Sequence, residues 1–167
     1  MSAENNIGSN QHNLTASVEE GPYYKQGSPE RANIVEAGTV GTRLVVEGRV
    51  LDRSGNPVPH AWLDFWHADG TGKYDNEGFN LRGHQYTDEN GRYCLETIKP
   101  LEYLFRAVHV HAKVRANKNS PVLTTQLFFP GEEKNKPDPI FESLTVMDVV
   151  ESTEGLKATF DFVVESD

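Results

Sequence analysis

The chain is organised around short stretches in which hydrophobic and polar residues alternate, from about residue 42 to its end. The clearest alternation lies near the C-terminus, at Leu156, Ala158, Phe160, Phe162 and Val164. Alternate residues of a strand face opposite sides of a sheet, so this period of two predicts half-buried strands. No segment keeps a helical period of 3.6 residues between recognisable caps. The pattern therefore predicts a chain built mainly of strands.

Further strands are expected over 43–50, 61–67, 92–98, 107–114 and 124–129, and a short helical turn over 30–36. Two tight reversals separate some of these stretches. Residues 54–57, Ser-Gly-Asn-Pro, carry turn chemistry, and Asn90-Gly91 tolerates positive φ at both positions. Strands spaced by turns, without helices between them, favour an all-β fold with little helix. We expect an antiparallel β-sandwich.

The length of 167 residues suits one domain. Residues 1–20 are polar and predict a mobile N-terminal arm, with residues 21–167 forming the single folded domain. The Gly21-Pro22-Tyr23-Tyr24 segment breaks the polar pattern and suggests that the arm becomes fixed there.

Charge and composition exclude several classes of function. The formal net charge of −9 argues against nucleic acid as a partner, since phosphate contacts need clustered Lys and Arg. No apolar run approaches the roughly 20 residues that cross a bilayer, and the first 20 residues are not a secretory signal. Cys94 is the only cysteine, which excludes an internal disulfide and argues against a Cys-based zinc site. We expect a soluble, cytoplasmic protein.

The most informative stretch for chemistry is Arg106-Ala-Val-His109-Val-His111. Residues two apart on a strand share a face, so the two imidazoles point the same way and can converge on a metal ion. A solvent-facing pair of polar residues is the simpler alternative. Tyr74 and Tyr103 are the remaining candidate donors, although each alone would suit a core or interface position.

Taken in order, these residues resemble the intradiol ring-cleavage dioxygenase family. The resemblance begins at about Gly21 and continues through Trp66-His-Ala-Asp, Gly72-Lys-Tyr74 and Leu81-Arg-Gly. It continues through Thr87-Asp, Gly91-Arg-Tyr, Thr97-Ile-Lys-Pro, Tyr103-x-x-Arg106-x-x-His109-x-His111 and Thr125-Gln-Leu-Phe-Phe129. The ordered set is far more specific than any of its parts.

The resemblance implies one non-haem Fe(III) per chain, held by Tyr74, Tyr103, His109 and His111. Phenolate is a hard anionic donor that suits ferric iron, and metal binding lowers the pKa of a phenol from about 10. The implied reaction cleaves a catechol-type ring between its two hydroxylated carbons with O2, giving a cis,cis-muconate-type diacid. The implied partners are therefore a small catecholic substrate and O2.

Other roles are implied in the same way. Tyr103 would leave the metal and help deprotonate the substrate, Arg106 would stabilise negative charge on the ring, and Gln126 would line the pocket. Trp66 is expected to wall the site, or to belong to the core, and Tyr24 to lie near the pocket mouth.

Two departures from the family bear on substrate and assembly. Only Leu104 and Phe105 separate Tyr103 from Arg106, where protocatechuate-cleaving members carry a longer insertion, so a more open mouth is expected. The chain also lacks room for the N-terminal helical dimerisation region of the catechol and hydroxyquinol enzymes, which leaves open whether it forms a homo-oligomer.

Two alternatives remain. The first half of the motif set also resembles noncatalytic, prealbumin-like β-sandwich modules that bind or assemble, and the His pair could load Zn²⁺ or Cu²⁺. The sequence does not identify the catechol, and the net charge slightly favours a neutral one. A ring carboxylate would need another cation at the mouth, for which the candidates are Lys25, Arg31, Arg43 and Arg82. Roles for His60, His67 and His84 are not assigned.

Overall fold

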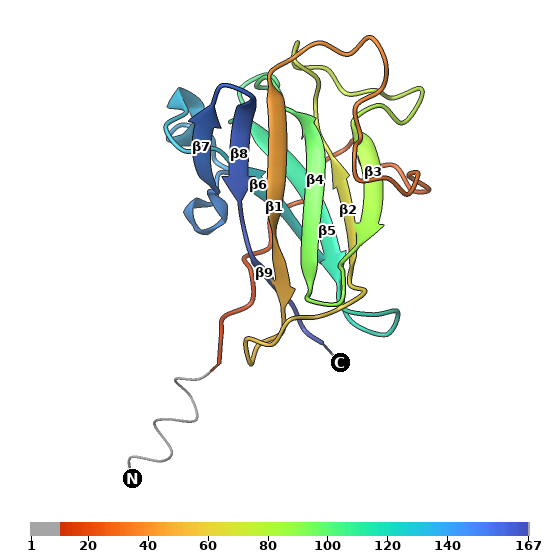
Figure 1. The fold of residues 1–167 in the computed structure, drawn as a ribbon. Helices are drawn as coiled ribbons and strands as arrows, with labels where there is room; N and C mark the ends of the chain where they lie inside the picture. Colours follow the sequence, from red (N-terminus) through yellow and green to blue (C-terminus); the bar gives the residue numbers. More distant parts are fainter. Residues whose placement is uncertain (1–10, 167) are drawn as a thin grey trace.

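Two β-sheets stacked face to face form the protein in the computed structural model, which describes residues 11–166 (Figure 1). One sheet has the order β4 (Arg92–Ile98), β1 (Arg43–Leu51), β8 (Gly155–Thr159) and β7 (Asp148–Ser152), and β9 (Phe162–Val163) extends the pairing along β1. The other has the order β3 (Arg82–Tyr86), β2 (Trp62–Trp66), β5 (His109–Arg115) and β6 (Leu123–Phe128). Two single-turn 3-10 helices, η1 (Glu133–Asn135) and η2 (Ser143–Thr145), follow β6.

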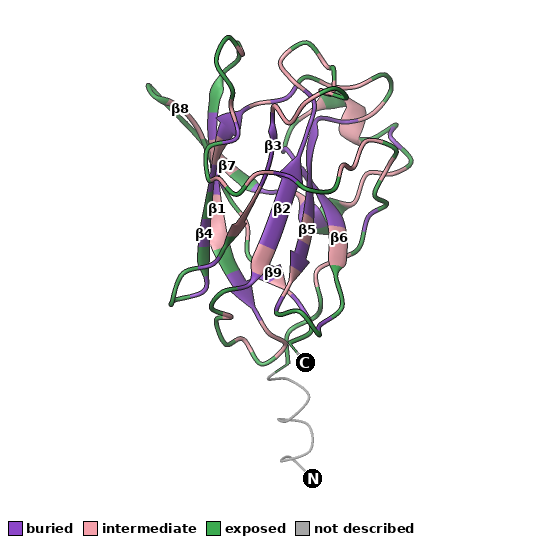
Figure 2. Ribbon diagram, turned by 90° about the vertical axis from the view of Figure 1, so that its right-hand side faces the viewer, coloured by how far each residue is buried: buried purple, intermediate pink, exposed green. Residues whose placement is uncertain are grey.

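The core lies between the two sheets and takes alternate residues from each strand. Leu44 and Val46 of β1 and Val110 and Ala112 of β5 are fully buried, and β2 and β5 are coloured mostly as buried in Figure 2. Gly48 shows how closely β1 and the following chain approach one another. A Cβ atom at this position would lie 1.9 Å from the carbonyl oxygen of Phe160.

The predicted β-sandwich is confirmed, with three differences of detail. β3 and β7 were not predicted, because neither shows a clean alternation. β8 and β9 run parallel to β1, so the expected purely antiparallel arrangement is wrong for that sheet. The helical turn expected over 30–36 is also wrong: Glu30 and Asn33 form strand bridges to His84 and Glu96, which bury Ile34 completely.

The described part of the predicted N-terminal arm contacts the sheets at several points, and its mobility stays a prediction. The amide of Val18 donates to Thr124, the side chain of Thr125 donates to Ala16, and that of Gln126 donates to Glu19. Residues 16–19 therefore lie along the edge of β6, whereas the amides of His12 and Thr15 donate to Arg53 and Val163. The rest of the predicted arm, residues 1–10, lies outside the described residues. Within residues 11–166, no helix has the length and apolar character needed to cross a bilayer.

Candidate metal centre

Two imidazoles meet on the outer face of the β3-β2-β5-β6 sheet. Val110, between them in β5, points into the core, and His109 and His111 therefore both point outward. Their Nε2 atoms are 3.1 Å apart, and both side chains are nonetheless buried. Two ring nitrogens at this distance need a shared proton or a cation between them, because two lone pairs would repel each other.

Neighbouring groups fix how each imidazole is oriented. His109 Nδ1 donates a 2.6 Å hydrogen bond to the carbonyl of Ala107, which leaves Nε2 as the acceptor nitrogen. The ring of His111 stacks on Trp66 with centroids 4.6 Å apart and an interplanar angle of 7°. Buried Nδ1 of His111 has no hydrogen-bond partner among the described residues. Both rings thus present Nε2 to the same point.

Tyr74 supplies an oxygen at this point. Its hydroxyl lies 2.9 Å from His111 Nε2 and 3.3 Å from His109 Nε2. Burial raises the pKa of Tyr74 above its ordinary value and lowers the pKa of His109 to about 4. Burial, and next the neighbouring His109, lower the pKa of His111 well below its usual range. Neutral imidazole is the form that ligates metals. A bound cation would offset the desolvation cost of a buried, negatively charged Tyr74 phenolate.

Tyr103 is joined to the centre through Tyr23, a residue that the sequence analysis passed over. The ring of Tyr23 stacks on Tyr74 with centroids 4.5 Å apart, and its hydroxyl hydrogen-bonds to the Tyr103 hydroxyl. The ring of Tyr103 in turn packs edge-on against Tyr74, with centroids 5.6 Å apart. The hydrogen bond to Tyr23 raises the pKa of Tyr103. The three phenols therefore form one packed group.

A buried ion pair holds Arg106 beside the centre. Its Nε donates to Asp138 Oδ2 at 2.8 Å, and its guanidinium also donates to Gln126 Oε1 at 2.5 Å. Burial alone would raise the pKa of Asp138, but hydrogen bonds from the Ala107 and Ile140 amides and from Arg106 bring it below its ordinary value. Asp138 was also missed, since no motif in its polar loop marked it.

A cavity of about 180 Å³ opens onto these groups. Tyr23, Tyr74, Tyr103, Arg106, His109 and His111 all line it. Leu104 and Phe105 lie at its rim, with 68% and 60% of their surfaces exposed. Leu104 adopts φ +53°, a left-handed conformation that lets the short segment turn back toward Arg106.

The structure places three expected pocket residues outside the lining of this cavity: Tyr24, Trp66 and the fully buried Gln126. The hydroxyl of Tyr24 donates to Asp64 Oδ2 at 3.0 Å, and its ring packs on Trp66. The chain alternates at this point, so Tyr23 faces the cavity in place of Tyr24. Trp66 is 1% exposed and acts as the platform beneath His111.

The four cations considered for a ring carboxylate are engaged elsewhere. Arg82 donates to the carbonyls of Tyr23 and Asp75, and Arg31 to those of Phe79 and Arg82. Lys25 donates to Gly78, and Arg43 pairs with Glu96 on the other sheet. Of the cations that the structure describes, Arg106 lines the cavity and these four do not.

The three unassigned histidines have separate surroundings. In the core, His67 donates from Nδ1 to the Ala68 carbonyl and accepts at Nε2 from Thr97, and burial lowers its pKa to about 4. Exposed His60 lies 3.5 Å from Glu89, and His84 contacts Ser28.

The donor set decides which metal chemistry these residues fit. Within residues 11–166, no three His, Cys, Asp or Glu side chains are grouped for a metal ion, and the candidate centre instead combines two imidazoles with tyrosine oxygens. Phenolate and imidazole suit a hard, highly charged cation such as Fe(III), and the two converging Nε2 atoms and the Tyr74 hydroxyl beside them match such a group.

Comparison with known proteins agrees with this reading. A family described as "Dioxygenase" matches residues 19–166. The chain is 32% identical over 161 residues to the protocatechuate 3,4-dioxygenase beta chain of Burkholderia cepacia, covering 79% of this chain and 68% of that one. It is 30% identical to the catechol 1,2-dioxygenase of Acinetobacter baylyi, covering 87% of this chain and 57% of that one. It thus spans about half to two thirds of the length of such relatives.

Solved structures extend the comparison over nearly the whole chain. The dioxygenase domain of a dioxygenase–carbohydrate-binding fusion from Streptomyces sp. SirexAA-E is 43% identical with a TM-score of 0.89, covering 93% of this chain and 100% of that one. An intradiol ring-cleavage dioxygenase from Tetranychus urticae is 25% identical with a TM-score of 0.81, covering 93% and 96%. The chain belongs to the intradiol ring-cleavage dioxygenase family.

Proposed function

We propose that this protein is a ferric dioxygenase that cleaves a catechol-type ring between its two hydroxylated carbons, with both atoms of O2 entering a cis,cis-muconate-type diacid. Tyr74, Tyr103, His109 and His111 would hold one non-haem Fe(III). The observation that carries this proposal is the convergence of the Tyr74 hydroxyl and the two Nε2 atoms within 3.3 Å of one another. A noncatalytic sandwich module has no need of such a cluster.

Fe(III), when bound, supplies the Lewis acid that makes a chelated catecholate reactive toward O2. The protein residues must first deprotonate and orient that diol. Tyr103, as a phenolate, would be the oxygen best placed to take a proton from the diol, because it is half-buried and lines the cavity. The hydroxyl of Tyr23, which contacts it, can pass the proton on or stabilise the Tyr103 phenolate by donating to it.

Arg106, oriented by Gln126, supplies the positive charge that complements negative charge on the substrate ring. The Arg106 guanidinium donates hydrogen bonds to both Asp138 and Gln126, and these two contacts fix it beside the cavity before any ligand enters. A cation fixed in this way stabilises negative charge that develops on the substrate ring without reorganising during the reaction. Gln126 is completely buried, and its amide donates to the Glu19 carbonyl, so its role is to orient Arg106.

The cavity favours a small substrate. Its volume of about 180 Å³ is below the roughly 300 Å³ from which drug-sized pockets begin, and it suits a single aromatic ring. Any larger ring substituent would extend past Leu104 and Phe105 into solvent. Among the described residues that line the cavity, Arg106 is the one Lys or Arg, and it is already paired with Asp138; this supports neutral catechols, without a ring carboxylate, as the substrate class.

The experiment combines metal content, colour and oxygen uptake. The iron-loaded protein is expected to be reddish through phenolate-to-iron charge transfer and to consume O2 with catechol, giving a product whose mass equals that of catechol plus O2. Tyr74→Phe should abolish or shift the band and stop oxygen uptake while leaving the fold intact. Tyr86→Phe is the matched control, since Tyr86 is exposed on β3.

Specific outcomes would contradict the proposal. Well-folded protein that stays colourless and takes up no iron would favour the noncatalytic module, and tight loading of Zn²⁺ or Cu²⁺ in preference to Fe(III) would favour a different metal. Retention of full oxygen uptake by Tyr74→Phe would show that this phenol is not part of the centre.

A further inference from the structure

A second cavity, of about 520 Å³, lies on the same outer sheet face as the candidate metal centre. Side chains of β2, β5 and β6 and of the N-terminal segment form its walls, among them Tyr24, Trp62, Asp64, Lys113, Arg115 and Thr124. Lys113 and Arg115 continue the outward-facing series of His109 and His111 along β5. The two cavities thus lie at successive positions along one strand.

A pair of adjacent tyrosines separates them. Tyr23 lines the cavity of the metal centre and Tyr24 lines the second cavity. Tyr24 is fixed in place, since its ring packs on Trp66 with centroids 4.7 Å apart and its hydroxyl donates to Asp64. A ligand in the second cavity would therefore not reach the metal centre, and the second cavity is a separate site.

The charged side chains of this cavity differ in whether they already have an ion-pair or hydrogen-bond partner. Lys113 pairs with Glu20 and donates to Thr124 at 3.0 Å. Asp64 is buried, and its two oxygens already accept from Ser28 at 2.8 Å and from Tyr24 at 3.0 Å. Arg115 differs from both, because its guanidinium forms no ion pair or hydrogen bond with any residue that the structure describes. Its charge is the one left for a ligand.

Trp62 holds Arg115 in position. The guanidinium lies over the indole with its carbon 5.0 Å from the ring centroid, and both side chains are half-buried. Such a contact limits the rotamers of the arginine and leaves the edge of its planar fork free to donate. A fork of parallel N–H donors matches the two oxygens of a carboxylate. The apolar surfaces of Trp62 and Val122 beside it can cover a small hydrocarbon body.

We propose that this cavity binds a small organic carboxylate, with Arg115 as the anchor of the carboxylate group. The cavity is nearly three times larger than that of the metal centre, so it accommodates an aromatic acid or an extended diacid. An aromatic acid would come from the surroundings of the enzyme, whereas a diacid of the muconate type would be its own product if the proposed function holds.

The test measures binding of benzoate, cis,cis-muconate and the neutral benzyl alcohol to the iron-loaded protein by titration calorimetry. Both carboxylates are expected to bind and benzyl alcohol to bind at least tenfold more weakly. Arg115→Gln should weaken carboxylate binding roughly ten- to hundredfold, the range for a hydrogen bond to a charged group. Arg115→Lys keeps the positive charge but loses the two parallel N–H donors. Its carboxylate affinity should therefore lie between those of the parent protein and of Arg115→Gln.

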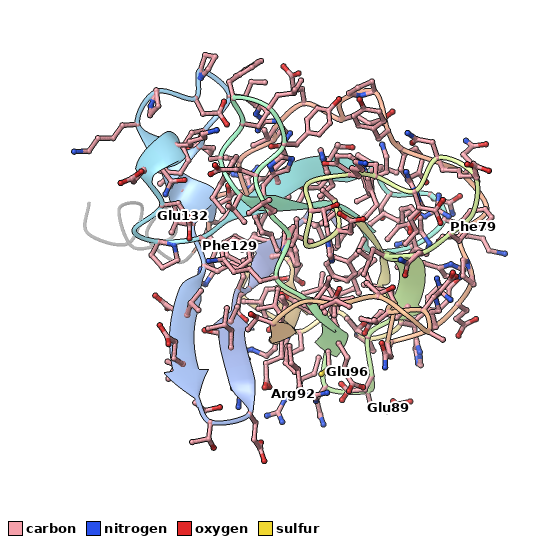
Figure 3. The ribbon with its side chains drawn as sticks, turned by 90° about the horizontal axis from the view of Figure 1, so that it is seen from above. Phe79, Glu89, Arg92, Glu96, Phe129 and Glu132 are labelled. Atoms are coloured by element: carbon pink, nitrogen blue, oxygen red, sulfur yellow. The ribbon has the colours of Figure 1, made fainter. Side chains whose placement is uncertain are left out.

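Arg92→Gln is the matched control, because Arg92 is an exposed arginine of β4 in the other sheet (Figure 3). It should bind both carboxylates as the parent does. Tighter binding of benzoate would identify an aromatic acid as the natural ligand, and tighter binding of muconate would identify the product. Only the muconate measurement rests on the proposed function. Benzoate could bind even if the protein showed no oxygen uptake, so the failure of one proposal can be distinguished from the failure of the other.

Three results would overturn the proposal. Equal affinity for benzoate and benzyl alcohol would show that the carboxylate is not recognised. Unchanged binding by folded Arg115→Gln and Arg115→Lys would remove Arg115 as the anchor. Displacement of benzoate by one equivalent of an unreactive catechol analogue, together with a change in the visible iron band, would place the carboxylate at the metal centre.

Discussion

Replacing Asp138 with asparagine tests whether the buried ion pair holds Arg106 in place. The Asp138 side chain is 0% exposed and that of Arg106 is 11% exposed, and their closest atoms are 2.8 Å apart. The same carboxylate oxygen also accepts from the Ala107 amide at 2.7 Å. An asparagine has one acceptor oxygen, so in either orientation its NH₂ group faces at least one N–H donor, that of Ile140 or those of Ala107 and Arg106.

The expected loss of stability follows from that mismatch. Each buried donor left unpaired costs about 1–3 kcal/mol, and breaking a buried ion pair costs about 3–5 kcal/mol. We therefore expect Asp138→Asn to lower the free energy of unfolding by about 3 kcal/mol. Glu132→Gln is the matched control (Figure 3), because Glu132 pairs with Lys99 at the same 2.8 Å while the two side chains are 25% and 31% exposed. That change should cost less than about 1 kcal/mol.

Urea unfolding at pH 7 measures both variants, and oxygen uptake measures the effect on the site. Asp138→Asn should reduce kcat more than KM for the substrate, because Arg106 is needed chiefly as charge develops in the transition state. A double-mutant cycle with Arg106→Leu should recover part of the lost stability, since the orphaned charge is then gone. Equal losses in Asp138→Asn and Glu132→Gln would refute the reasoning.

Three further predictions concern other parts of the molecule. Tyr23→Phe removes the hydroxyl that contacts Tyr103 while keeping the ring, so it should shift the visible iron band and lower the free energy of unfolding by less than about 1.5 kcal/mol. Gly48→Ala should lower the free energy of unfolding by about 3 kcal/mol in urea, because the new methyl group meets the backbone oxygen of Phe160, which cannot rotate away. The pKa of His67 is lowered to about 4 by burial, so the unfolded chain binds its proton first and stability falls as the pH drops below about 6.5. Between pH 7 and pH 5 this amounts to about 2 kcal/mol, and a His67→Gln variant should lack that part of the decline.

How far the fold could be predicted depended on the strength of each local pattern. β1 and β4 alternate largely between buried and more exposed residues, and the period of two located them. In β5 the alternation is of apolar and polar residue types, since its first four residues are all buried. β3 is short and contains Gly83 and His84, so it has no such signal. The parallel pairing of β8 with β1 could not be predicted either, because pairing direction depends on tertiary contacts between segments over 100 residues apart.

For the candidate site as well, some residues could be predicted from the sequence and others could not. His109 and His111 were identified because strand geometry places alternate residues on one face. Asp138 lies in a polar loop and becomes important only because the fold brings it beside Arg106, 32 residues earlier in the chain. Tyr23 and Tyr24 are adjacent, and sequence alone could not decide which of them faces the cavity of the candidate metal centre. Burial and long-range hydrogen bonds decide this, and neither has a local signature.

The contacts around the site explain how a sandwich scaffold can orient these candidate ligands without a bound metal. Burying two imidazoles and a phenol together costs solvation free energy, and burial shifts their pKa values toward the neutral forms, which can share protons. The orientation of each ring is fixed from outside the cluster, His109 by the Ala107 carbonyl and His111 by Trp66. A trivalent cation would replace those shared protons without requiring the rings to turn. Because the protein has already met the cost of orienting its donors, the centre would bind its metal strongly and hold it in a fixed geometry.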